Sequence, residues 1–132
     1  MSVTGVVVIT HGNAAEDMVQ AAERVVGRPL DVRTISVPIG EPRSETEIHI
    51  ERVVIDLHAE EVLFLTDLEG STPYNLCCKR CGGRSVVLSG MNLPMLFKLA
   101  TADREHGALS LAEELRATGL KSIHIRTAMG TK

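Results

Sequence analysis

The stretch Val6-Val7-Val8-Ile9-Thr10-His11-Gly12 decides the fold of this chain of 132 residues. Its apolar run, which begins at Val3, predicts a strand over Val3–Ile9 that is buried on both faces. Gly12 ends the run, and residues 14–26 then carry apolar side chains at helical spacing. His11 is therefore predicted to stand at the carboxyl end of a buried strand, where open α/β folds collect ligands and chemistry.

The composition narrows the class of protein. Hydrophobic residues make up 44% of the chain and charged residues 23%, which fits one globular domain. Aromatic residues are 2% and the formal net charge is −3, which argues against a nucleic-acid-binding module. No stretch approaches the roughly 20 apolar residues of a membrane span, and no signal peptide is apparent. With three cysteines clustered at positions 77, 78 and 81, these features predict a cytoplasmic protein.

Strand and helix patterns alternate along the rest of the chain. Further strands are predicted over 31–37, 61–66, 84–89 and 121–126. Helices are predicted over 14–26, 44–58, 73–81, 94–102 and 109–117, the second opened by a capping box at Ser44 and Glu47 and the last closed by Gly119. The chain is expected to form a single domain over residues 1–126, followed by a frayed tail over 127–132.

Four strand–helix units predict an α/β fold, a parallel sheet with helices on both faces. If the first strand lies between the second and the third, the strand order is 2-1-3-4 and the winding switches direction between strands 1 and 3. Asp67 directly follows the third strand, just as His11 follows the first. The two side chains are therefore expected to face each other across the crevice at this switch point.

An imidazole beside a carboxylate serves as a general base, a metal ligand or a phosphoryl acceptor. A base needs a nucleophile, but the nearby Ser71 and Thr72 lack a Gly-x-Ser-x-Gly elbow. A metal site needs further ligands, and the other four histidines show no ligand spacing to His11. The third role fits best, because a carboxylate that accepts from one ring nitrogen leaves the other as a nucleophile.

Donors for a phosphoryl group are expected in two places. Two predicted helices begin after Gly12-Asn13 and at Thr72-Pro73, and their N-termini favour an anion. Gly12 and Gly70 permit tight turns, Gly70 also allows close approach of the backbone, and the hydroxyls of Ser71 and Thr72 can donate. Ser71 and Thr72 are also expected as helix caps, a role that is compatible with phosphate binding, whereas Asn13 is expected only to cap the first helix.

Three motifs, taken in order, resemble those of a known family. They are Thr10-His11-Gly12 with Ala14-Ala15-Glu16, then Asp67-Leu68-x-Gly70-Ser71-Thr72-Pro73, and finally Asn92-Leu93-Pro94-Met95-Leu96. Each motif is weak alone, but the three together at these separations are specific. The chain resembles the mannose-family enzyme IIA of the bacterial sugar phosphotransferase system, from about residue 3 to residue 126.

The resemblance implies that His11 accepts phosphate from the phosphocarrier HPr and passes it to an enzyme IIB. Asp67 would hold the histidine ring, and Thr72 would contact the phosphoryl group. The resemblance also implies the 2-1-3-4 sheet and an antiparallel C-terminal strand exchanged within a homodimer, which suits Ile123 and Ile125. No metal or organic cofactor is needed, no nucleic acid is bound, and the membrane is reached only through partner subunits.

Two loop positions depart from the family pattern. An aromatic or apolar residue usually stands where this chain has Glu69, and a second glycine where it has Ser71. Glu69 places a negative charge beside a phosphate site, so its role bears on the identity of the partners. The alternative function is a regulatory phosphohistidine protein without sugar transport. The sugar itself is bound by other components, so this sequence does not name it.

The three cysteines offer a different hypothesis, a thiol or metal module. Cys77 and Cys81 share a helix face, and Cys78-x-x-Cys81 has the spacing of a redox motif. The motif lies deep in the predicted helix rather than at its start, and a zinc site would lack a second ligand pair. Buried cysteines commonly act as small apolar residues, which is the role expected here.

Overall fold

The computed structural model describes residues 3–79 and 84–132. A parallel sheet is built from four strands, β1 (Gly5–His11), β2 (Arg33–Val37), β3 (Val62–Thr66) and β4 (Ser85–Leu88). The helices are α1 (Ala14–Val26), α2 (Arg43–Leu57), α3 (Thr72–Cys78), α4 (Leu93–Lys98) and α5 (Ala108–Lys121). The chain closes with two short strands, β5 (Arg126–Thr127) and β6 (Gly130–Thr131).

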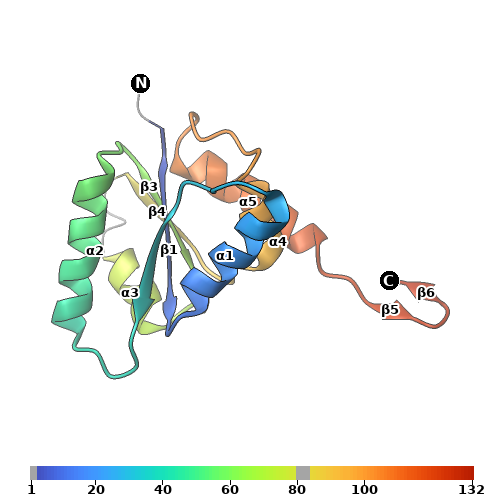
Figure 1. The fold of residues 1–132 in the computed structure, drawn as a ribbon, viewed down its shortest axis with the longest axis horizontal. Coiled ribbons are helices and arrows are strands. Elements are labelled where there is room, and N and C mark those ends of the chain that lie inside the picture. The colour runs from blue at the N-terminus through green and yellow to red at the C-terminus, as the bar shows by residue number, and fades with distance from the viewer. Residues whose placement is uncertain (1–2, 80–83) are drawn as a thin grey trace.

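The sheet confirms the predicted topology. Its order is β2-β1-β3-β4, and every pairing in it is parallel. Helices α2 and α3 cover one face, while α1, α4 and α5 cover the other (Figure 1). The direction of winding therefore switches between β1 and β3, whose carboxyl ends lie side by side because Ile9 is in register with Thr66.

The central strands are buried on both faces, as their unbroken apolar runs predict. On β1, Val6 and Val8 pack toward α1, α4 and α5, whereas Val7 and Ile9 pack toward α2 and α3. Strand side chains alternate, so the next two residues continue the pattern on opposite faces. Residue 10 thus belongs to the α1 face and residue 11 to the α3 face.

The predicted N-terminal caps of α1 and α2 are wrong, and Thr72 lies inside α3 with Ser71 alone as its cap. Helix α2 begins at Arg43, after Pro42 in the N-cap position, so Ser44 lies inside the first turn and forms no capping box with Glu47. The helix begins earlier than the capping-box pattern predicts because the ring of Pro42 already holds φ near the helical value. Asn13 holds the N-cap position of α1, but its side chain makes no capping hydrogen bond.

Helix α5 differs from the expected 109–117, because Gly119 lies within the helix rather than ending it. Gly119 is buried against α4, and a Cβ placed on it would lie 2.5 Å from the Met95 Cε and 3.0 Å from the Met95 Cγ. The side-chain amide of Asn92 also donates to the Gly119 carbonyl at 3.2 Å. The glycine is therefore a packing residue that lets two helices approach closely.

Replacing Gly119 with valine is expected to destabilise the protein by about 1–3 kcal/mol, because overpacking forces neighbours out of place. Chemical denaturation of the purified variant measures this change. Ala117→Val, on the exposed side of the same helix, is the matched control and should cost less than about 0.5 kcal/mol. Equal losses in the two variants would mean that β-branching in the helix, not the contact with Met95, sets the cost.

The C-terminal strand forms at a different place from the one predicted. Residues 121–126 alternate in polarity, yet α5 extends to Lys121 and no regular structure follows until Arg126. Strand β5 pairs antiparallel with β6 in a small hairpin, so the expected tail over 127–132 is folded back on itself. The hairpin stands away from the sheet and its helices (Figure 1). An alternating pattern makes a strand only where a neighbouring edge accepts its hydrogen bonds.

Candidate functional site

His11 is the last residue of β1 and lies beside Asp67, which follows β3 directly. The His11 Nδ1 is 3.3 Å from the Asp67 Oδ2, and the main-chain N–H of His11 donates to the same oxygen at 3.4 Å. The two side chains are partly open to solvent, 43% for His11 and 30% for Asp67. The structure thus brings the predicted pair together at the switch point of the sheet. Asp67 therefore contacts Nδ1 and not Nε2, the other ring nitrogen.

In the turn between His11 and α1, one main-chain N–H group is hydrogen-bonded within the part of the protein that the structure describes and two are not. Gly12 adopts a φ of +55°, which favours glycine, and its N–H donates to the Val37 carbonyl at 2.9 Å. Gly12 therefore shapes the turn, and its amide is already used. The N–H groups of Asn13 and Ala14 have no hydrogen-bond partner within the described residues. These two amides lie at the start of α1, a helix of 13 residues whose N-terminus carries a partial positive charge.

The loop between β3 and α3 holds the other predicted phosphate contacts. Gly70 has a φ of +81°, and its carbonyl accepts from the Asn75 side chain at 3.3 Å. The Ser71 Oγ caps α3 by accepting from the Tyr74 N–H at 3.2 Å, as expected. Thr72 is the first residue of α3 and is half-buried. The Ser71 hydroxyl keeps its proton for a further acceptor, so capping and anion binding remain compatible.

The structure shows a structural role for Thr10, the residue before His11, that the sequence alone does not predict. Thr10 is fully buried, and its Oγ1 accepts from the Ala15 N–H at 2.7 Å. It thus does the capping expected of Asn13, from the end of the preceding strand. A polar residue that closes an otherwise apolar strand was the available signal. Buried polar side chains are bonded in most structures, so Thr10 needed a partner nearby.

The rim of the site carries exposed apolar and acidic side chains. Ile39, in the loop after β2, is 93% exposed, and Leu68, next to Asp67, is 62% exposed. Glu69 is also exposed.

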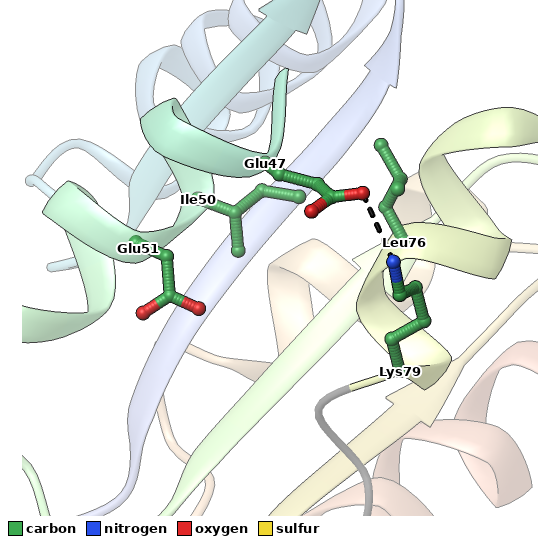
Figure 2. Close-up of a pocket in the computed structure, with 5 residues that line it drawn as sticks. All are labelled: Glu47, Ile50, Glu51, Leu76 and Lys79. Carbon is green, nitrogen blue, oxygen red and sulfur yellow. Dashed lines mark hydrogen bonds and ion pairs between the residues drawn. The ribbon is translucent and has the colours of Figure 1, made fainter. Parts of the chain in front are cut away.

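A separate hollow of about 350 Å³ lies between α2 and α3. Figure 2 shows the residues that line it, Glu47, Ile50 and Glu51 of α2, Leu76 of α3 and Lys79 just after α3. The Lys79 Nζ lies 3.0 Å from the Glu47 Oε1. Lys79 follows the last residue of α3, whereas Thr72, the predicted phosphoryl contact, is its first residue. The hollow is therefore distinct from the candidate site.

The two cysteines that the structure describes, Cys77 and Cys78, lie on α3 away from His11. Cys77 is buried and Cys78 is half-buried on α3, and Cys81 lies outside the described residues. Over residues 3–79 and 84–132, no group of three or more His, Cys, Asp or Glu side chains is placed to hold a metal ion. In the same part of the chain, no helix combines the length and the apolar character that a bilayer crossing requires.

Comparisons with known proteins place this geometry in a family. Residues 5–116 match the family model EIIA-man, described as the PTS system fructose IIA component. The mannose-specific EIIAB component of Escherichia coli K12 is 30% identical over 128 residues, which covers 89% of this chain. The fructose-specific EIIA component of Bacillus subtilis is 27% identical over 124 residues, which covers 91% of this chain and 84% of the relative. This chain spans only 39% of the length of the Escherichia coli protein.

Solved structures agree with this placement. The mannose/sorbose specific IIA subunit of Enterococcus faecalis aligns with a TM-score of 0.86 over 96% of both chains, at 23% identity. The PTS IIA protein associated with the fucose utilization operon of Streptococcus pneumoniae aligns with a TM-score of 0.77 at 30% identity, over 93% of this chain and 94% of that one. With the family model matched along most of its length, the chain belongs to the mannose-type IIA family of the sugar phosphotransferase system.

Proposed function

We propose that this protein is a phosphoryl carrier that accepts phosphate on His11 from the phosphocarrier HPr and passes it to an enzyme IIB. The observation that carries the proposal is the contact of 3.3 Å between the His11 Nδ1 and the Asp67 Oδ2. A carboxylate there favours a proton on Nδ1, and the Nε2 lone pair then points away from Asp67. Nε2 is the nucleophile of the proposed reaction.

The proposed transfer exchanges one nitrogen–phosphorus bond for another. The Nε2 lone pair attacks the phosphorus of the phosphohistidine on HPr, in line with the bond that breaks. The electron pair of that bond returns to the ring nitrogen of HPr, so HPr leaves as the free carrier. His11 keeps its proton on Nδ1, and Asp67 stabilises the positive charge that the ring acquires. Transfer to enzyme IIB repeats the same steps with His11 as the donor.

The phosphoryl oxygens need donors that are already in place. We assign this role to the N–H groups of Asn13 and Ala14 and to the hydroxyls of Ser71 and Thr72, because each lies on a loop that reaches the carboxyl end of β1 or β3. Gly12 and Gly70 contribute the turns that aim these groups. No metal enters the scheme, since the amides and the α1 N-terminus balance part of the phosphate charge.

Reconstitution tests the proposal. The protein is incubated with phosphoenolpyruvate, enzyme I and HPr, and its intact mass is read under neutral conditions. We expect one phosphate per chain, which is lost in acid as a phosphohistidine requires. A protein that stays unmodified while HPr in the same tube is phosphorylated would refute HPr as its donor.

The protein that receives the phosphate distinguishes a transport role from a regulatory role. A transport component passes its phosphate to an enzyme IIB, whereas a regulatory phosphohistidine protein keeps it. We favour the transport role in the cytoplasm, where HPr and phosphoenolpyruvate would both be at hand. Glu69 stands on the rim that the partner must cover, so a partner with a cation opposite this position is favoured.

We also propose a homodimer joined through the C-terminal segment. Ile123 and Ile125 are 71% and 62% exposed, which is costly for two large apolar side chains in one short segment. Strand β4 is an edge of the sheet, and a hollow of about 120 Å³ lies between it and α5. The segment after α5 of a second copy fits this edge as an added antiparallel strand.

Truncation after Lys121 is expected to convert the dimer into a monomer, because it removes the segment that pairs with β4. Sedimentation equilibrium at micromolar concentration measures the mass of both forms. The single substitution Val25→Ser, at an exposed apolar residue of α1, is the control and should leave the dimer intact. A full-length chain that sediments as a monomer, or a truncated chain that stays dimeric, contradicts the arrangement.

A further inference from the structure

Thr10 and His11 point to opposite faces of β1, although they are neighbours in the chain. Val6 and Val8 pack on the α1 side, and Thr10 continues that row, where its Oγ1 accepts from the Ala15 N–H of α1 at 2.7 Å. His11 continues the row on the other side. The hydrogen bond therefore closes a loop of four residues that contains His11, and it ties the end of the strand to the first turn of the helix.

The hydrogen bond from the Ala15 N–H to Thr10 also affects which main-chain N–H groups of the turn can donate to a ligand. Four N–H groups around the turn have acceptors: that of His11 bonds Asp67, that of Gly12 bonds Val37, that of Ala15 bonds Thr10, and that of Asp17 bonds Asn13. The amides of Asn13 and Ala14 lie between them and have no partner within the described residues. Loss of the Thr10 acceptor would free the Ala15 N–H and allow the turn to shift.

We infer that Thr10 is a positioning residue for phosphoryl transfer, acting through the turn that carries His11. Its hydroxyl holds Nδ1 of His11 against Asp67 on one side of the strand and holds the two open amides toward Nε2. Thr10 does not touch the phosphoryl group itself, because its side chain is fully buried on the opposite face. This inference rests on the proposed function of His11.

Thr10→Val and Thr10→Ser test the inference, since valine keeps the branched shape without the hydroxyl and serine keeps the hydroxyl. Phosphorylation of His11 by HPr is followed by intact mass at a temperature where all variants are folded. We expect Thr10→Val to be slower by about tenfold or more, because small displacements of reacting groups are costly. Thr10→Ser should stay within about threefold of the wild-type rate on the same grounds. Nitrogen NMR of the His11 ring should show one tautomer in the wild type and a mixture in Thr10→Val.

Two controls separate positioning from stability. Val8→Ala removes a buried side chain from the same face of β1 and lowers stability without touching the turn. Thr4→Val replaces a buried threonine at the other end of the row, whose Oγ1 has no partner among the described residues. Both controls should phosphorylate at the wild-type rate and keep a single His11 tautomer.

Several results would overturn the inference. A Thr10→Val variant that matches the wild type in both rate and ring tautomer would leave Thr10 with the role of a helix cap alone. An equal slowing in Val8→Ala would point to general destabilisation, and an equal slowing in Thr10→Ser would show that the hydroxyl is not what acts. If HPr fails to modify even the wild type, the proposed donor is wrong. The ring tautomers, and the rate with phosphoramidate as a small phosphoryl donor, then still decide the role of Thr10.

Discussion

Substitution of His11 by alanine is expected to abolish phosphorylation of the protein. The other four histidines stand elsewhere, and none of them follows a strand at the switch point of the sheet beside Asp67. Without the imidazole, no nucleophile remains between the Asn13 and Ala14 amides and the α3 loop. Intact mass after reconstitution with phosphoenolpyruvate, enzyme I and HPr should show the unmodified chain. Removal of an exposed side chain leaves the fold intact, so the thermal midpoint should hardly change.

The chain supplies a matched control for this experiment. His106 also lies beside an aspartate, with its Nε2 3.3 Å from the Asp103 Oδ2, but on a surface loop before α5. His106→Ala should accept one phosphate as the wild type does. Phosphate on His11→Ala at the wild-type level would show that His11 is not the acceptor. Loss of phosphate in His106→Ala would show that a surface Asp–His pair suffices for the chemistry.

Substitution of Asp67 by alanine is expected to slow phosphorylation by about 10²-fold or more, as loss of a group that orients a catalytic histidine does. Three effects act together. The proton is no longer held on Nδ1, the positive charge of the phosphorylated ring loses its counter-ion, and the His11 N–H loses its acceptor. Asp67→Asn keeps the shape and an acceptor, so it should retain more activity than Asp67→Ala. Initial rates with excess phosphorylated HPr measure both variants.

Asp103→Asn is the control for the aspartate, because it removes the charge from the other Asp–His pair at the same separation of 3.3 Å. It should leave the rate unchanged. If Asp67→Ala transfers phosphate at the wild-type rate, Asp67 has no part in orienting the ring. A slow but still complete modification, in contrast, is the result that an orienting carboxylate predicts, since Nε2 itself remains.

The central part of the fold was predictable because its signals are periodic and local. Continuous apolar runs such as Val6–Ile9 fit strands covered on both faces, and the helical spacing after Gly12 gives the crossover. Parallel strands bring their carboxyl ends to one edge, so His11 and Asp67 meet although 56 positions separate them. The place where the two side chains meet, at the switch point of the sheet, follows from that topology.

The helix ends and the C-terminus were not predictable in the same way. Ser44 lies in a capping-box pattern, but Pro42 starts the helix first. Glycine commonly ends a helix, but Gly119 lies inside α5 and leaves room for the side chain of Met95, which is distant in the sequence. The alternation of residues 121–126 is a valid strand pattern, but among the described strands none of the sheet pairs with it. Each of these features depends on what packs against the residue, not on the residue itself.

The sequence by itself determined the parallel 2-1-3-4 sheet, the meeting of His11 with Asp67 and the loops that surround them. Only the tertiary structure decided that Nδ1 faces the carboxylate, that the Gly12 amide is taken by Val37, and that Thr10 rather than Asn13 caps α1. The two kinds of feature depend on different numbers of residues and different positional precision. Periodic burial selects a fold over many residues, whereas a hydrogen bond depends on the position of single atoms to within a few tenths of an ångström.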